Sequence, residues 1–88
     1  MMYLVHWFVA PQTRDENNDR FRKKGHNEVA GVKILNAVYA LHEGDGWAIV
    51  EAEDPVALGK WVHNWSDLNE QEVIPVVDEK GRLAIMGA

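Results

Sequence analysis

The clearest pattern of apolar and polar positions lies in residues 46–68, which predict a strand, a sharp helix start and an amphipathic helix. Residues 46–52 carry Trp47, Ile49 and Val50, side chains that favour a half-buried strand. Asp54 and Pro55 then supply an N-cap oxygen and a proline at the first helical position. Apolar residues follow at the spacing of a single helix face, namely Leu58, Trp61, Val62, Trp65 and Leu68. At this spacing the two tryptophans are expected to be core residues rather than a ligand-stacking pair.

Two further elements are predicted in the first part of the chain. Residues 3–10 alternate with both faces mostly apolar, which is typical of a central strand. Residues 14–24 predict a helix that is opened by a capping box of Thr13 and Glu16 and closed by Gly25. This helix contains a single large apolar residue, so its pattern is weaker than that of the tryptophan-rich helix.

The remaining pattern predicts two more strands and a short tail. Residues 32–42 are rich in β-branched and aromatic side chains and predict a long strand, followed by a hairpin turn at residues 43–46. Residues 70–77 alternate as a strand, and Pro75 places it at a sheet edge or near its own end. The tail beyond it fits either a turn with a short fifth strand or a C-terminal helix. We favour the turn because Gly81 is unfavourable inside a helix.

The predicted order is β–α–β–β–α–β, the arrangement of an α+β ferredoxin-like fold. It places four antiparallel strands in one sheet with both helices on one face. The strand over residues 32–42 is strongly polar on neither side, so the face without helices is expected to be apolar. Such a face predicts a partner, and the simplest one is a second copy of the chain, packed sheet to sheet as a homodimer.

Size and composition narrow the class of protein. Residues 1–88 make a single domain, and a chain this short buries only about 60% of its unfolded surface. It has no cysteine for a disulfide, which leaves four tryptophans and self-association as sources of added stability.

Charge and hydropathy predict a cytoplasmic protein with neither nucleic acid nor membrane as partner. The net charge is −5, and the chain shows neither a leader segment nor a long apolar run. The basic residues 20–24 complement the dipole of their helix.

Three segments carry a likeness to known proteins: YLVHWFVAP near the start, GVKILNAVYALHEGDGWAIVEAED in the middle, and ALGKWVHNWSDL before EVIPVVD. Together they resemble a small bacterial family of unknown function in the ferredoxin-like, dimeric α/β-barrel superfamily. The resemblance spans nearly the whole chain and implies both the fold and a dimer. Relatives often have a histidine where this chain has Tyr39, so no histidine role transfers to that position. Wider members of the superfamily include cofactor-free monooxygenases, small-molecule isomerases and haem enzymes, which are analogies only.

Two titratable residues of the predicted sheet are candidates for catalysis. His6 lies between Leu4 and Phe8 on an apolar strand face, where an imidazole can act as a general base or bind a ligand. Glu51 shares a strand face with Trp47, and its carboxylate can orient a substrate if that face lines a cavity. We favour the plainer interpretation for both, a histidine with one hydrogen-bonding partner or at a dimer contact and a solvated glutamate at a strand end.

Four residues are candidates for contacts with a small-molecule ligand: Tyr39, Asn36, Phe8 and Trp47. Tyr39 and Asn36 lie on opposite faces of one strand, so only one of them can join a given cavity. Asn36 alternatively marks a β-bulge. No metal or cofactor is predicted, because the acidic and histidine side chains of residues 42–45 are typical of a solvated turn.

The sequence thus supports two functions of different classes. The first is a homodimeric protein that binds a small molecule or serves a structural role. The alternative is a cofactor-independent enzyme of the monooxygenase or isomerase type, with His6 and Glu51 as its acid–base residues. We favour the first because catalysis requires several groups that converge, whereas the sequence offers only isolated ones.

Overall fold

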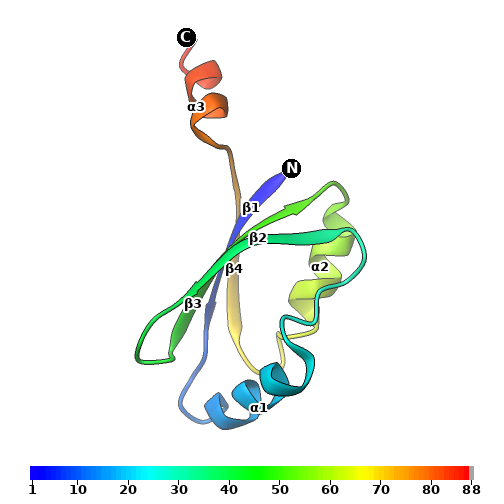
Figure 1. Ribbon diagram of the computed structural model, residues 1–88, viewed down its shortest axis with the longest axis vertical. Helices are drawn as coiled ribbons and strands as arrows, with labels where there is room; N and C mark the ends of the chain where they lie inside the picture. Colours follow the sequence, from blue (N-terminus) through cyan, green and yellow to red (C-terminus); the bar gives the residue numbers. More distant parts are fainter. Residues whose placement is uncertain (88) are drawn as a thin grey trace.

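The computed structural model describes residues 1–87 and contains the predicted βαββαβ order followed by one more helix (Figure 1). The strands are Met2–Phe8 (β1), Val32–Tyr39 (β2), Asp45–Ala52 (β3) and Glu70–Val76 (β4), and the helices are Arg14–Lys24 (α1), Pro55–His63 (α2) and Glu79–Ile85 (α3). The strands form one antiparallel sheet in the order β2-β3-β1-β4. The α+β ferredoxin-like fold predicted from the sequence is confirmed. No helix in the described part of the chain is long and apolar enough to cross a membrane.

The sheet matches the strand patterns in its details. β1 lies between β3 and β4, as its two apolar faces predict, and β4 with Pro75 lies at an edge. The pairing of β2 with β3 shifts register between Ile34 and Asn36, so the strand is irregular next to Asn36, in agreement with the alternative interpretation of that residue as the mark of a bulge. Tyr39 pairs with Gly46 on the helix side of the sheet, whereas Asn36 pairs with a residue of the opposite side.

The hydrophobic core lies between the sheet and α2. Val5 of β1 and Val50 of β3 are fully buried at its centre. Leu58, Trp61 and Trp65 cover them from the helix side, and each of the three is at most 8% exposed. The prediction that the two tryptophans belong to the core is therefore confirmed.

The start of α2 follows its sequence signal, but its end does not. The Asp54 side chain accepts a hydrogen bond from the Val56 amide at 2.9 Å, and Pro55 occupies the first turn. The helix ends at His63 rather than near Leu68. The residues between them form turns that still direct Trp65 and Leu68 into the interior.

Helix α1 lies at the end of the molecule opposite α3 and does not pack closely on the sheet (Figure 1). Asn17 is its only buried residue, and Phe21, its only large apolar side chain, is 40% exposed. A helix with so few apolar side chains gains little by lying flat against a sheet, because burial of apolar area is the main driving force for such packing.

Polar contacts hold α1 in place instead. Thr13 Oγ1 donates to the Leu68 carbonyl at 2.8 Å rather than capping its own helix, so the predicted capping box is wrong. Farther along α1, the Arg20 guanidinium donates to both carboxylate oxygens of Asp67, at 2.7 and 2.8 Å. It also donates to the Asn64 carbonyl at 2.8 Å. Long-range bonds to the segment after α2 have thus replaced the local cap.

The tail forms the helix α3, so the predicted turn with a fifth strand is wrong. Asp78 accepts a hydrogen bond from the Gly81 amide at 2.8 Å and caps the helix. A Cβ atom at position 81 would lie 2.7 Å from the Val77 Cβ, so glycine allows Val77 to lie over the first turn. The residue that argued against a helix is therefore the one that lets this helix start. The last position of the predicted tail, Ala88, lies outside the described residues.

The sheet face opposite α1 and α2, called here the open face, carries no helix. It consists of alternate residues of each strand and includes Met2, Leu4, His6 and Phe8 of β1 and Asp45, Trp47, Ile49 and Glu51 of β3. Among its apolar residues, Phe8, Val38 and Ile74 are 44–53% exposed. The face without helices that the sequence predicts is present, but its apolar residues are interspersed with charged ones such as Asp45, Glu51 and Glu72.

Candidate ligand-binding site

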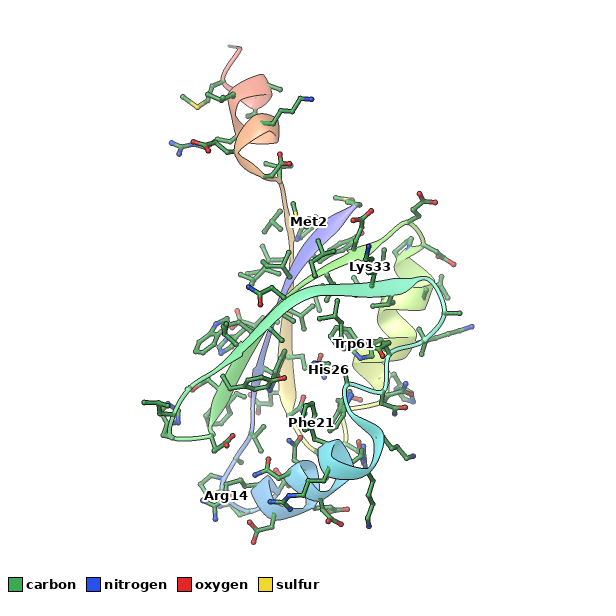
Figure 2. All side chains as sticks on the ribbon, in the orientation of Figure 1. Met2, Arg14, Phe21, His26, Lys33 and Trp61 are labelled. Carbon is green, nitrogen blue, oxygen red and sulfur yellow. The ribbon has the colours of Figure 1, made fainter. Side chains whose placement is uncertain are left out.

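A cavity of about 320 Å³ lies on the helix side of the sheet, where α1 stands away from it. Its aromatic lining comprises Trp7, Phe21, Tyr39, Trp61 and Trp65, and its polar lining includes Asn17, His26, Glu43, Asn69 and Gln71. Figure 2 shows Phe21 of α1, then His26, then Trp61 of α2, following one another along this side of the sheet. The cavity exists because the apolar-poor α1 leaves the end of the sheet uncovered.

Trp7 on β1 forms part of the cavity wall because its neighbour on β3 is glycine. Trp7 and Gly46 are paired across the two strands. A Cβ atom at position 46 would lie 2.3 Å from the indole ring, so only glycine lets the ring lie over the β3 backbone. Gly46 therefore sets the orientation of Trp7 on this side of the sheet.

The loop that carries His26 is fixed by the two tryptophans of the core. The indole nitrogens of Trp61 and Trp65 both donate to the His26 carbonyl, at 2.8 and 2.9 Å. The next residue, Asn27, has a φ of 53°, a left-handed conformation that asparagine tolerates better than most residues. The tryptophan pair thus positions the histidine of this loop in addition to filling the core.

Three rings meet around the His26 side chain. The Tyr39 hydroxyl lies 3.5 Å from His26 Nε2, at the long limit of a hydrogen bond. Phe21 contacts the imidazole edge to face, with ring centroids 5.2 Å apart, and lies 6.1 Å from the Tyr39 ring. Burial, and then the nearby Glu43 carboxylate, raise the pKa of Tyr39, so its hydroxyl stays neutral at physiological pH.

A chain of amide side chains lines the cavity near α1. Asn69 Nδ2 donates to Asn17 Oδ1 at 2.8 Å, and Gln71 Nε2 donates to Asn69 Oδ1 at 2.9 Å. Because the Asn17 oxygen accepts from within the protein, its NH₂ group is the part that can donate to a ligand. This side of the cavity therefore offers fixed hydrogen-bonding groups beside the aromatic rings.

The residues proposed from the sequence divide between the two faces of the sheet. Tyr39 lines the cavity. His6, Phe8, Asn36, Trp47 and Glu51 lie on the open face, where none of them lines that cavity. The structure thus separates Tyr39 from the other five candidates.

On the open face, His6 lies between two carboxylates. Its Nε2 is 2.8 Å from Asp45 Oδ1, its Nδ1 is 3.1 Å from Glu72 Oε1, and its ring stacks on Trp47 with centroids 5.0 Å apart. The hydrogen bond to Asp45, followed by that to Glu72, raises the pKa of His6. Glu51 lies four residues beyond Trp47 on β3, about 13 Å farther along the strand. His6 and Glu51 therefore share a face without being neighbours.

No motif in the sequence marks His26, Phe21 or Asn17 as site residues. The composition of α1 did give one indication of a cavity. A helix with a single large apolar residue cannot cover the sheet beneath it. The role of His26 depends on hydrogen bonds to residues 35 and 39 positions away in the chain, which no local pattern reveals. Within residues 1–87, no cluster of three or more histidine or acidic side chains has a geometry that could hold a metal ion.

The chain belongs to the family described as domain of unknown function DUF3303, whose match covers residues 1–88. Among curated proteins, no sequence matches it significantly. The family description carries no activity, so functional inference rests on the cavity and the open face.

Proposed function

We propose that this protein binds a small planar aromatic molecule in the cavity beneath α1. The observation that carries the proposal is the cavity itself. Its volume of about 320 Å³ falls at the lower end of the range typical of small-molecule sites, roughly 300–1,000 Å³. Large apolar rings with a few fixed polar groups are the usual lining of such sites.

The lining indicates the chemistry of the ligand. The rings of Trp7, Phe21 and Tyr39 favour a flat apolar body, because aromatic rings gain from stacked or edge-to-face contact. The imidazole of His26 and the amide of Asn17 favour at least one hydroxyl, carbonyl or amide group on that body. We therefore expect an aromatic compound with one or two polar substituents.

The four tryptophans provide a direct test by nuclear magnetic resonance. Trp7, Trp61 and Trp65 line the cavity, whereas Trp47 lies on the other face of the sheet. Titration with a panel of phenols and hydroxylated bicyclic compounds is expected to shift the indole N–H signals of the first three and to leave that of Trp47 in place. Shifts confined to Trp47, or no binding across the panel, would contradict the proposal.

Matched variants locate the binding site. Tyr39→Phe keeps the ring and removes the hydroxyl, and His26→Gln removes the imidazole. Each is expected to weaken binding by roughly fivefold to tenfold, the effect of one net hydrogen bond of about 1 kcal/mol. Trp47→Phe is the control and should bind as the parent does. Equal affinity in all three variants would mean that the compound binds elsewhere.

We further propose that two copies of the chain pack through their open faces. The support is the apolar character of this face, which includes Phe8, Val38 and Ile74 at 44–53% exposure. Exposed apolar patches of this kind mark interaction surfaces, and a two-fold dimer buries the same patch of both copies. Light scattering coupled to size exclusion tests this, and a particle of 10.0 kDa at micromolar concentration would refute it.

A second candidate function is cofactor-independent acid–base catalysis by His6 and Glu51. The observation in its favour is the position of His6 between two carboxylates, which raises its pKa and so favours the protonated form that can donate a proton. The distance from Glu51 counts against a shared site within one chain. If a compound bound at the open face is oxygenated or isomerised, His6→Gln and Glu51→Gln should each stop this turnover and leave the binding of aromatic compounds in the cavity beneath α1 unchanged. Full activity in both variants would exclude the hypothesis.

A further inference from the structure

Residues 77–87, called here the C-terminal arm, leave the domain beyond the end of β4. Figure 1 shows α3 at the far end of the molecule from α1, away from the sheet and from α2. None of its residues is buried. The exposed apolar side chains of the arm are Val77 at 55%, Leu83 at 48%, Ile85 at 75% and Met86 at 65%.

A helix of this length does not persist in water by itself. Helix nucleation is unfavourable, and isolated helices shorter than about 12–15 residues are marginal even with good helix formers. The Asp78 cap stabilises the start of α3, but Gly81 offsets much of this gain because glycine is a poor helix former. The seven residues of α3 therefore need a surface to pack against.

The open face of a second copy is a surface of the right kind and size. Four strands about 4.8 Å apart and seven residues at about 3.3 Å each give a face of about 440 Å² in projection. A stable interface buries roughly 800 Å² on each partner. The projection understates the accessible surface of the side chains on this face, and an apolar arm adds further area to what each copy buries.

The arm has no net charge, because Asp78 and Glu79 balance Lys80 and Arg82, but the two cations have acidic counterparts on this partner. Lys80 and Arg82 of the arm form no ion pair with any other residue of the part of the chain that the structure describes. The open face carries exposed carboxylates, among them Glu51 and Glu72. Cations of the arm would meet these carboxylates, which favours the correct docking of one copy on the other.

We propose that the C-terminal arm of each protomer packs on the open face of its partner, so that the two arms are exchanged across the dimer. The inference rests on the homodimer of the proposed function and adds a segment that no sheet-to-sheet contact requires. Val77, Leu83 and Met86 supply the apolar contacts, and Lys80 and Arg82 supply the charges.

Substitutions in the full chain test the exchange. Leu83→Asp combined with Met86→Asp places two carboxylates on the apolar contact surface of the arm, and Val56→Asp on α2 is the control, since Val56 is 61% exposed and belongs to neither surface. Light scattering over a dilution series is expected to show at least tenfold weaker dimerisation for the arm variant and unchanged dimerisation for the control. Because all three sites are exposed, well-dispersed amide spectra should confirm that each variant stays folded.

An isotope-filtered nuclear Overhauser experiment on a mixture of labelled and unlabelled protein identifies what the arm contacts. Signals between Leu83 or Met86 methyls and Phe8 or Trp47 of the other chain are expected. A dimer with contacts between the open faces but none from the arm, and with normal dimerisation of the arm variant, overturns the exchange and leaves the sheet-to-sheet dimer intact. A monomeric parent protein overturns both, while the cavity proposal is tested separately by its own titration.

Discussion

The two indole hydrogen bonds to the His26 carbonyl make a quantitative prediction about stability. Trp61→Phe and Trp65→Phe each remove one donor, but the other donor still satisfies the carbonyl. Each single variant loses a net hydrogen bond of about 1 kcal/mol and a further 1 kcal/mol or so from incomplete packing of the smaller ring. The free energy of unfolding should therefore fall by about 2 kcal/mol in each.

The double variant should lose more than the sum of the two. With both indoles gone, the partly buried carbonyl has no donor, which adds a desolvation penalty of about 1 kcal/mol or more. A domain of 88 residues has roughly 4–13 kcal/mol of stability, so a total loss of about 5 kcal/mol is measurable if a stabilising osmolyte is present for every variant. The coupling energy is the difference between the double change and the two single changes.

The assay is urea unfolding followed by far-ultraviolet circular dichroism at one fixed protein concentration. Trp47→Phe serves as a control, since it also removes an indole but one that lies on the open face and stacks on His6. A coupling energy below about 0.5 kcal/mol would refute the reasoning, because additive effects would mean that water replaces the indoles at the carbonyl.

Three further predictions concern the cap, the open-face histidine and the cavity wall. Asp54→Ala removes the N-cap of α2 and should lower the free energy of unfolding by about 1 kcal/mol in the same urea assay, whereas Asp54→Ser should restore most of it. The pKa of His6 is higher in the folded protein than in the unfolded chain. Its contribution to the free energy of unfolding is therefore fully present below the unfolded pKa of about 6.5 and is lost as the pH rises through the folded pKa. Unfolding at pH 6 and pH 9 should show that His6→Gln abolishes this part of the pH dependence, and a His6 imidazole that titrates below 6.5 by nuclear magnetic resonance would contradict the assignment. Gly46→Ala forces a Cβ atom against Trp7 and should move that indole signal and weaken ligand binding; an unchanged spectrum would show that the ring is not held there.

Much of the fold follows from local rules that act within a few residues. The central position of β1 follows from its two apolar faces, the edge position of β4 follows from Pro75, and the start of α2 follows from Asp54 and the proline after it. These signals work because strand burial, proline placement and capping depend on residues close together in sequence. The wrong predictions arise because local rules do not include contacts between residues far apart in the chain. Thr13 was expected to cap its own helix, but it bonds to a carbonyl 55 residues away.

The tail shows the limit of propensity in particular. Gly81 disfavours a helix in isolation, yet Asp78 and Val77 use the absence of its side chain to start α3. The penalty for glycine is about 1 kcal/mol, which is small enough for a cap and one packing contact to outweigh it. A sequence pattern includes the glycine penalty, but it does not include the cap of Asp78 and the packing of Val77, which form only when the helix is present.

The sequence by itself determined the order of the elements from β1 to β4, the presence of a sheet face without helices and the scarcity of apolar side chains on α1. Only the tertiary structure decided that this scarcity leaves a cavity, and that His26, Tyr39 and Phe21 meet there. The physical reason lies in the range of the interactions involved. Periodicity and caps act over one or two turns, whereas the site depends on where α1 stands relative to the sheet. That distance is set by bonds between segments far apart in the chain, such as the pair formed by Arg20 and Asp67.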